Sequence, residues 1–269
     1  MTGLHLIRGA PLILAAAWAP VALAADTTEP FDLGATDVEF YMGFDGIGPA
    51  GGERALYGDI LLGYGLLSRL SGYVGTTLSA NEHFADGNAD VYLGLYGTPL
   101  DTDHFDVDLF LDFAAGGDGF DEFALTPMTE INFDLDPDQG SWGLYTRVAL
   151  PLYGQPRGDD SAEHERAFDV VINPGTYFSV GERHQILIEA EMSFHPSAAE
   201  DEHTTDIGGV ALGYNVSLTR DGSFEMANQV FVDIPREGEQ TAVGVSTGFI
   251  VTLPSARRDS VAQVASLRR

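Results

Sequence analysis

A period-two alternation of apolar and polar side chains is the dominant pattern of this sequence, and its sharpest example is HFDVDLFLDF, from His104 to Phe113. Successive side chains of a β-strand point to opposite faces, so this segment predicts a strand with one apolar and one acidic face. The apolar face comprises Phe105, Val107, Leu109, Leu111 and Phe113, and the opposite face carries Asp106, Asp108 and Asp112 together with Phe110. A soluble sandwich or a membrane barrel could each use such a strand, so its recurrence along the chain decides between them.

The alternation recurs in about twelve segments separated by clusters of Gly, Asp, Pro and Ser, which is typical of antiparallel strands. Most of these segments are longer than the roughly five or six residues of soluble strands and match the roughly 9 to 11 tilted residues that cross a bilayer. One segment is ambiguous, because Ile207 to Tyr214 is apolar or glycine at both parities. We predict strands at about 38–47, 56–66, 70–79, 89–98, 104–114, 124–135, 141–153, 167–179, 184–195, 206–218, 223–234 and 241–253.

The connections between these strands alternate in length. Odd-numbered connections are long, as in 154–166 and 196–205, and even-numbered ones are short, as in 67–69, 99–103 and 180–183. Outer-membrane barrels alternate tight periplasmic turns with longer outer loops in this way. An even number of strands also predicts that both ends of the chain lie on the turn side.

The first residues predict an export signal. Arg8 precedes the apolar run from Pro11 to Ala25, which ends in small residues. The run is too short for a convincing membrane helix, and no other stretch approaches the roughly 18 to 20 apolar residues that a spanning helix needs. We predict a signal peptide over 1–25, a lead-in over 26–37, a barrel over 38–253 and a periplasmic tail over 254–269.

The composition is acidic and lacks cysteine. Asp and Glu total 41 against 13 basic residues, all of them arginine, which gives a formal net charge of -28. This balance argues against nucleic acid as a partner, because phosphate binding needs a basic face. The absence of cysteine leaves packing and hydrogen bonding to stabilise an exported chain, and closure of a barrel would supply both.

The signal, the long alternating strands and the rhythm of short turns and longer loops together resemble bacterial outer-membrane β-barrels of the small twelve-stranded channel class. The resemblance covers Val38 to Leu253 and is one of pattern, without a family-specific motif. It implies an all-β fold, an antiparallel up-and-down transmembrane barrel of about 12 strands in contact with outer-membrane lipid. The chain departs from the class at its end, because such barrels usually finish on an aromatic residue that the assembly machinery reads. Here the last strand ends at Leu253 and the chain continues, with Phe249 as an internal substitute.

The acidic faces of the predicted strands would converge inside such a barrel. Their negative potential would concentrate cations and exclude anions. Arg147 is the one basic residue among them, and we expect it to be an ion-pair partner. We predict a pore lining of Asp106, Asp108, Asp112, Glu130, Asp134, Arg147, Asp169, Glu189, Glu191 and Glu225.

An enzyme is disfavoured by the positions of the histidines. Twelve-stranded outer-membrane lipases would need a His and Ser pair on the lipid face, and the spacing places none there. No cofactor is expected. Acidic loop runs could hold a hard cation, although such runs are more often solvated loop tips; the candidates are Asp159, Asp160, Glu200, Asp201 and Glu202.

These patterns predict a non-enzymatic, passive outer-membrane pore for small neutral or cationic solutes. Two alternatives stay open at this point. One is a closed structural or surface-interaction barrel whose acidic loops bind divalent cations and, through them, lipopolysaccharide. The other is a periplasmic β-sandwich that binds a ligand.

Overall fold

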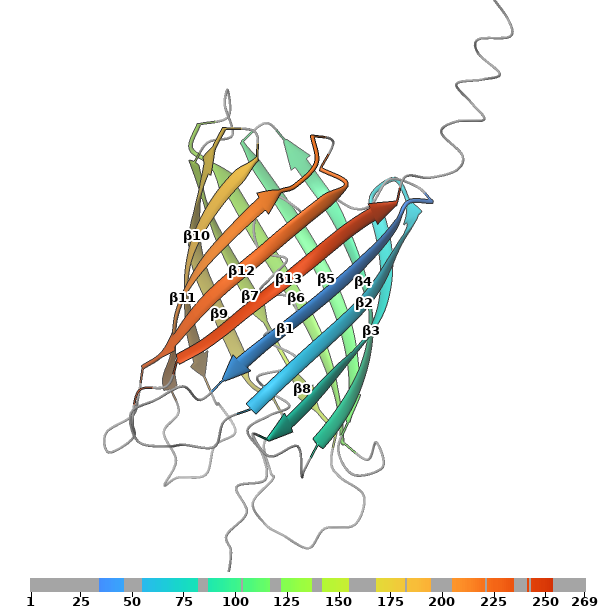
Figure 1. Cartoon of the computed structure of the whole chain (residues 1–269), viewed down its shortest axis with the longest axis vertical. Helices are drawn as coiled ribbons and strands as arrows, with labels where there is room; N and C mark the ends of the chain where they lie inside the picture. The colour runs from blue at the N-terminus through green and yellow to red at the C-terminus, as the bar shows by residue number, and fades with distance from the viewer. Residues whose placement is uncertain are drawn as a thin grey trace, which may run out of the picture.

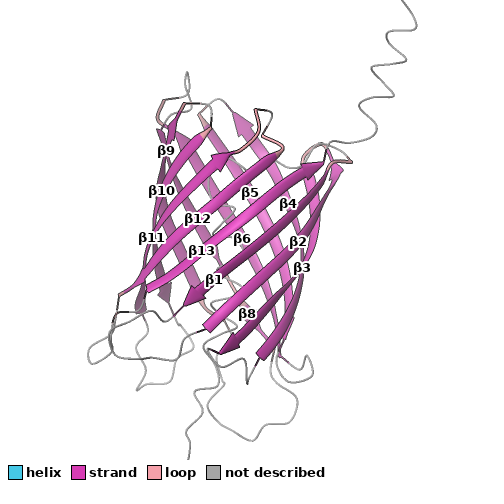
Figure 2. Ribbon diagram, in the orientation of Figure 1, coloured by secondary structure: helices cyan, strands magenta, loops and turns pink. Residues whose placement is uncertain are grey.

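The computed structural model shows one closed, antiparallel β-barrel (Figure 1). Figure 2 shows that the described part of the chain consists of strands and their connections. No helix in this part is long and apolar enough to cross a membrane. The structure describes residues 34–45, 55–81, 87–102, 104–116, 122–136, 142–154, 168–181, 183–194, 205–220, 222–234, 241 and 243–253.

The strands follow one another around the barrel in chain order. They are β1 (Thr36–Asp45), β2 (Ala55–Leu67), β3 (Leu70–Asn81), β4 (Gly87–Thr102), β5 (Phe105–Gly116), β6 (Glu122–Asp134), β7 (Trp142–Ala149), β8 (Leu152–Tyr153), β9 (Val170–Val180), β10 (His184–Phe194), β11 (Thr205–Ser217), β12 (Phe224–Asp233) and β13 (Val243–Leu253). Consecutive strands pair, except that β7 pairs with β9 and β8 pairs with β6, and β1 pairs with β13 to close the sheet. Closure removes both sheet edges, so no strand edge needs water.

The thirteen elements make up twelve wall strands, because β7 and β8 are two parts of one strand of the barrel. Both pair with β6, and they are separated by Leu150 and Pro151. Proline has no amide hydrogen for the ladder, which interrupts the strand predicted over 141–153. The Leu150 amide still donates to the Pro127 carbonyl at 3.0 Å, so the wall continues past the break. The prediction of a closed twelve-stranded barrel is therefore confirmed.

The short connections gather at one end of the barrel, which we call the turn end. Gly181 and Gly222 lie in these tight connections with φ of +66° and +68°, a conformation that residues with a Cβ rarely adopt. The first residue of β1 pairs with the last residue of β13, Thr36 with Leu253, at this same end. Both ends of the described barrel thus lie at the turn end, as the connection lengths predict.

The outer face of the barrel is apolar on every strand. Large side chains such as Leu62, Leu109 and Leu212 are 49 %, 47 % and 53 % exposed. Aromatic residues stand on this face near the turn end, including Trp142 stacked on Phe178 with ring centroids 6.0 Å apart. A continuous apolar surface bordered by aromatic side chains matches the lipid-facing band of outer-membrane barrels.

Two strand boundaries differ from the sequence prediction. The turn predicted over 99–103 is shorter, because β4 continues to Thr102 after a register shift between Gly97 and Leu100. The barrel also begins before residue 38, since Thr36 and Asp37 already pair with β13, and the Thr252 hydroxyl donates to the Asp37 carboxylate at 2.9 Å. The predicted signal, most of the lead-in and the predicted tail lie outside the described residues.

A β-bulge resolves the ambiguous strand. In β11, Gly209 pairs with Glu191 and Ile207 pairs with Met192, so Gly208 is an extra residue. The extra residue shifts the parity by one, and Ile207 and Val210 are both exposed on the outer face although three positions separate them. A strict alternation of period two could not place both Ile207 and Val210 on the outer face.

Tyrosine rings lie flat against the inner wall over glycines of the neighbouring strand. A Cβ on any of these glycines would collide with the ring, so the two residues fit only as a pair. The register shows each pair directly opposite across two strands. The pairs are Tyr41 with Gly248, Tyr57 with Gly43, Tyr73 with Gly94, Tyr92 with Gly75, Tyr145 with Gly175 and Tyr177 with Gly143.

Candidate functional site: the inner wall

Carboxylates dominate the inner face of the barrel. A single closed sheet can bury only its inner face, and Asp108, Glu130, Asp169 and Glu189 are at most 5 % exposed. Arg147, 3 % exposed, is the one basic side chain among the described residues that is buried there. Of the other residues predicted to line a pore, Asp106, Asp112, Asp134, Glu191 and Glu225 are half-buried.

Arg147 forms a buried ion pair across two strands. Its Nε and Nη2 donate to the Glu130 Oε2 at 2.9 and 2.5 Å, and the two residues are direct partners in the β6–β7 ladder. The register also places Arg147 opposite Asn173 of β9, whose amide donates to Glu189 Oε1 at 3.4 Å. This belt across β6, β7, β9 and β10 confirms the expectation that Arg147 is an ion-pair partner.

Neutral donors hold most of the other carboxylates. Thr77 and Tyr92 donate to Asp59 at 2.6 and 2.7 Å, and Tyr73 donates to Asp112. A hydroxyl or amide satisfies the hydrogen-bonding capacity of a carboxylate without cancelling its charge. The same kind of contact recurs around the wall, from Thr98 and Asn132 to Asp108, from Asn132 to Asp106, from Tyr153 to Asp169, from Tyr177 to Asp134 and from Ser217 to Glu225.

A second group of acids lies at the junction of the first and last strands. Asp37 and Glu39 are 2 % and 1 % exposed, and the Tyr41 hydroxyl donates to Glu39 Oε2 at 2.8 Å. The sequence places both acids on the polar side of their strand, but the predicted pore lining leaves them out. Asp59 on β2 is their acidic neighbour, and together with the acids of β5, β6 and β10 these residues extend over most of the inner wall.

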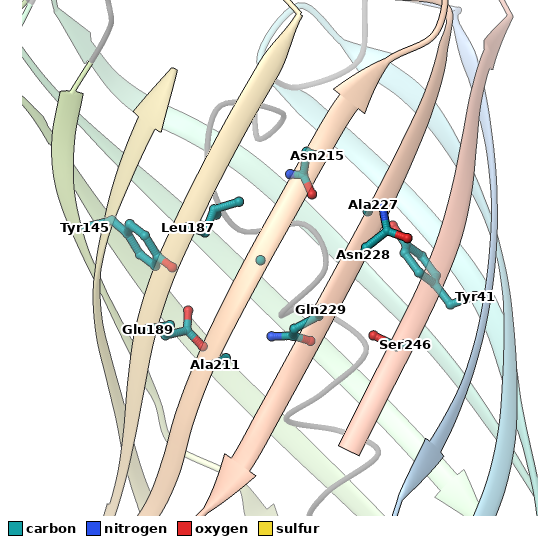
Figure 3. A pocket seen from close by; sticks show the side chains of 11 residues that line it. Tyr41, Tyr145, Leu187, Glu189, Ala211, Asn215, Ala227, Asn228, Gln229 and Ser246 are labelled. Atoms are coloured by element: carbon teal, nitrogen blue, oxygen red, sulfur yellow. The ribbon is translucent and has the colours of Figure 1, made fainter. Parts of the chain in front are cut away.

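The wall formed by β11, β12 and β13 is different. Its inward positions carry small or uncharged residues, among them Ala211, Gly213, Ala227 and Ser246. A hollow opens over this wall, and Figure 3 shows Tyr145, Leu187 and Glu189 on one side of it and Tyr41, Asn228 and Ser246 on the other. The lining residues are Tyr41, Tyr145, Leu187, Glu189, Ala211, Gly213, Asn215, Ala227, Asn228, Gln229 and Ser246.

Three buried polar atoms near the Arg147 belt have no hydrogen-bond partner in the described structure. They are Glu130 Oε1, Glu189 Oε2 and the Tyr145 hydroxyl. Two of these three residues, Glu189 and Tyr145, also line the hollow. Buried polar groups normally form hydrogen bonds, so the Glu189 carboxylate and the Tyr145 hydroxyl beside the hollow make it the candidate binding site on the inner wall.

Metal ligands do not gather on the described wall. No group of three or more His, Cys, Asp or Glu side chains that could hold a metal ion occurs among the described residues. The acidic candidates Asp159, Asp160, Glu200, Asp201 and Glu202 lie outside them. Divalent-cation binding by the loops therefore stays a prediction.

Sequence reasoning missed the hollow and its uncharged lining. Parity correctly suggests that Tyr41 and Tyr145 point inward, but nothing in the sequence indicates that each faces a glycine. That match depends on the register between strands, which alternation alone does not determine. Asn215, Gln229 and Ser246 were also missed, because scattered uncharged residues on a polar face carry no motif.

The fold is that of outer-membrane channels. An outer membrane channel from Pseudomonas putida F1 aligns with a TM-score of 0.64 and 12 % identity over 84 % of this chain and 98 % of that one. The NanC porin aligns with a TM-score of 0.60 and 8 % identity over 80 % of this chain and 100 % of that one. The KdgM porin aligns with a TM-score of 0.52 and 7 % identity over 79 % of this chain and 98 % of that one. Another structure of the KdgM porin is in complex with disordered oligogalacturonate. No protein-family model and no curated protein matches the sequence.

Proposed function

We propose that this barrel lies in the outer membrane and acts as a passive pore for small neutral and cationic solutes. The apolar outer face supports the location, because only hydrocarbon suits such a surface on all strands. The likeness in fold to outer-membrane channels supports the role of a pore. Cell fractionation followed by gel migration with and without heating tests the location, since folded barrels migrate differently from unfolded ones.

The charge of the inner wall is the observation that carries the cation preference. Carboxylates of β1, β2, β5, β6 and β10, together with Asp169 just before β9, lie on the inner wall, and Arg147 is their one basic counterpart among the described buried residues. Fields from one sign of charge add inside a narrow, low-dielectric wall. A polyanion such as the oligogalacturonate bound to the KdgM porin would be repelled by this lumen. The proposed solute class therefore differs from that ligand despite the common fold.

The tyrosine and glycine pairs support a passage. A ring that lies against a glycine extends along the wall, whereas the same ring over a larger residue would project into the lumen. Six inward tyrosines are accommodated in this way in the described strands. The pairs thus reduce the volume that large side chains take from the lumen.

Reversal potentials in planar bilayers test the proposal. With a salt gradient, the sign should be that of cation selectivity, and the triple variant Asp106→Asn, Asp112→Asn and Glu191→Gln should move the potential toward zero. The preference should also weaken as salt rises, because the screening length falls from about 10 Å at 0.1 M to about 3 Å at 1 M. Anion selectivity would contradict the proposal.

A closed structural barrel is the second candidate. The observation that favours it is the near-complete burial of Glu130, Asp169 and Ser71 on the inner wall, each 0 % exposed. Such a barrel would act through its surface, including the predicted binding of divalent cations and lipopolysaccharide by its loops. Well-folded protein that gives no conductance would favour this function over the pore.

A further inference from the structure

The hollow over β11, β12 and β13 has the features of a binding subsite. Its lining includes the small inward residue Ala211, where a larger side chain would fill the space, and Gly213, against which the Leu187 side chain packs. Its cavity volume, for the centre of a water-sized sphere, is about 20 Å³. This is room for one or two molecules of the size of water or ammonium. A sugar or a peptide would not fit without movement of the wall.

The open groups of the hollow are acceptors. Glu189 is 5 % exposed and Tyr145 is 4 % exposed, and apart from their contact with each other neither Glu189 Oε2 nor the Tyr145 hydroxyl has a hydrogen-bond partner among the described residues. The two residues lie beside each other at the hollow (Figure 3). If the phenol turned its single proton toward Glu189, lone pairs would remain open on both oxygens.

The remaining lining suits a cation with N–H donors. Asn215, whose Nδ2 donates to Gln185 Oε1 at 3.4 Å, keeps its own Oδ1 as an acceptor, and Ser246 adds a hydroxyl. The ring of Tyr41 presents an aromatic face, which attracts cations through its quadrupole. Arg147 does not line the hollow, and its guanidinium is bound to Glu130. The hollow therefore combines one carboxylate, neutral acceptors and an aromatic ring.

We propose that this hollow binds ammonium or a primary methylammonium ion, with Glu189 as the counter-charge and the Tyr145 hydroxyl as a second acceptor. The ion would give its N–H bonds to oxygens that otherwise lack partners, which removes the cost of burying them. The site rests on the proposed pore, since the ion reaches it through the lumen. It adds to the proposed pore a binding site for one class of cation.

Saturation-transfer NMR with methylammonium chloride tests the site on the full, folded barrel in micelles, with protein-free micelles as the blank. The methyl signal should saturate with wild-type protein and fall when ammonium chloride competes. Glu189→Gln should weaken binding about tenfold, because a hydrogen bond to a charged group is lost while the shape is kept. Ala211→Val, which fills the hollow and leaves every charge in place, should weaken it as well.

Glu225→Gln is the matched control. It removes one carboxylate from the same lumen, but Glu225 does not line the hollow and accepts from Ser217 at 2.7 Å. Its methylammonium signal should equal that of wild type. Equal signals in Glu189→Gln and wild type, or an equal signal from tetramethylammonium, would overturn the site. A cation-selective reversal potential without methylammonium binding would refute the site and leave the pore standing, whereas binding without conductance would refute the pore alone.

Discussion

The two sides of the inner wall use their residues in different ways. From β5 to β10, charged and polar side chains bond to one another and fill the space, as the Glu130–Arg147 pair does. Across β11 to β13, the inward residues that line the hollow, such as Ala211, Ala227 and Ser246, are small and offer little bonding capacity. The comparison teaches that bonding and free volume are divided between the sides: one side is held by ion pairs and hydrogen bonds, and the other provides the free volume.

Removing Glu130 should have the largest effect on stability. Glu130→Gln leaves the buried Arg147 guanidinium without its main counter-charge, and breaking a buried ion pair in this way costs about 3 kcal/mol or more. Urea unfolding of the refolded barrel in lipid vesicles measures the change. The double variant Glu130→Gln with Arg147→Gln should recover part of the loss. A loss well under about 1 kcal/mol in the single variant would show that this side is not held by the pair.

Substitutions on the lipid-facing surface should have the same effect on the β5–β10 side of the barrel as on the β11–β13 side. Leu109 on β5 and Leu212 on β11 are comparably exposed to the outside. Leu109→Arg and Leu212→Arg, together with Ile188→Arg, should each cost about 2 to 4 kcal/mol when the charge faces mid-membrane. Membrane-assembly yield and unfolding in vesicles measure this, and Asp108→Asn on the inner face should be milder than any of them. Equal tolerance of inner and outer substitutions would contradict the assigned faces.

Crowding a ring should cost less than placing a charge in lipid. A methyl group at Gly248 would collide with the Tyr41 ring, so Gly248→Ala should destabilise by about 1 to 3 kcal/mol, the range for overpacking. Gly58→Ala is the control, because its nearest neighbour would be at an ordinary 3.7 Å. If the two variants unfolded at the same urea concentration, the fit of ring to glycine would have no energetic weight.

The smallest effect is expected on the side with free volume. The Gln229 side chain lines the hollow and forms no hydrogen bond with the described residues. Gln229→Ala should therefore change the free energy of unfolding by no more than about 0.5 kcal/mol. The same urea titration checks it against Glu130→Gln. A large loss would mean that the hollow side also stabilises the barrel, and the contrast between the sides would disappear.

The strands and their faces could be predicted because lipid and lumen impose opposite demands on alternate residues. The segment from Phe105 to Phe113 shows this, since its leucines are exposed outward and Asp108 is buried inward. The prediction failed where the backbone departs from strict alternation. Gly208 adds a residue to β11, where the hydrophobic pattern is ambiguous, and Pro151 interrupts a wall strand, and the hydrophobic period does not locate either event.

The inner site could be predicted only as a set of charges. Parity indicates that Glu130, Arg147 and Glu189 share a face, but their partnership depends on the register of β6, β7 and β9. Register determines which residues are opposite one another, and turn lengths restrict it without fixing it. The hollow required a further level of detail, because it arises from small residues that are silent in any charge or hydropathy pattern.

The Tyr41–Gly248 pair also bears on how the barrel closes during assembly. It lies on the junction of β1 and β13, the two strands that are furthest apart in the chain. A slip of two residues would keep every face correct but would set the ring against Ser246 or Ile250, where a side chain takes its space. A mispaired β1–β13 junction is thereby penalised. The fit of ring to glycine thus gives the β1–β13 junction an internal check of its register.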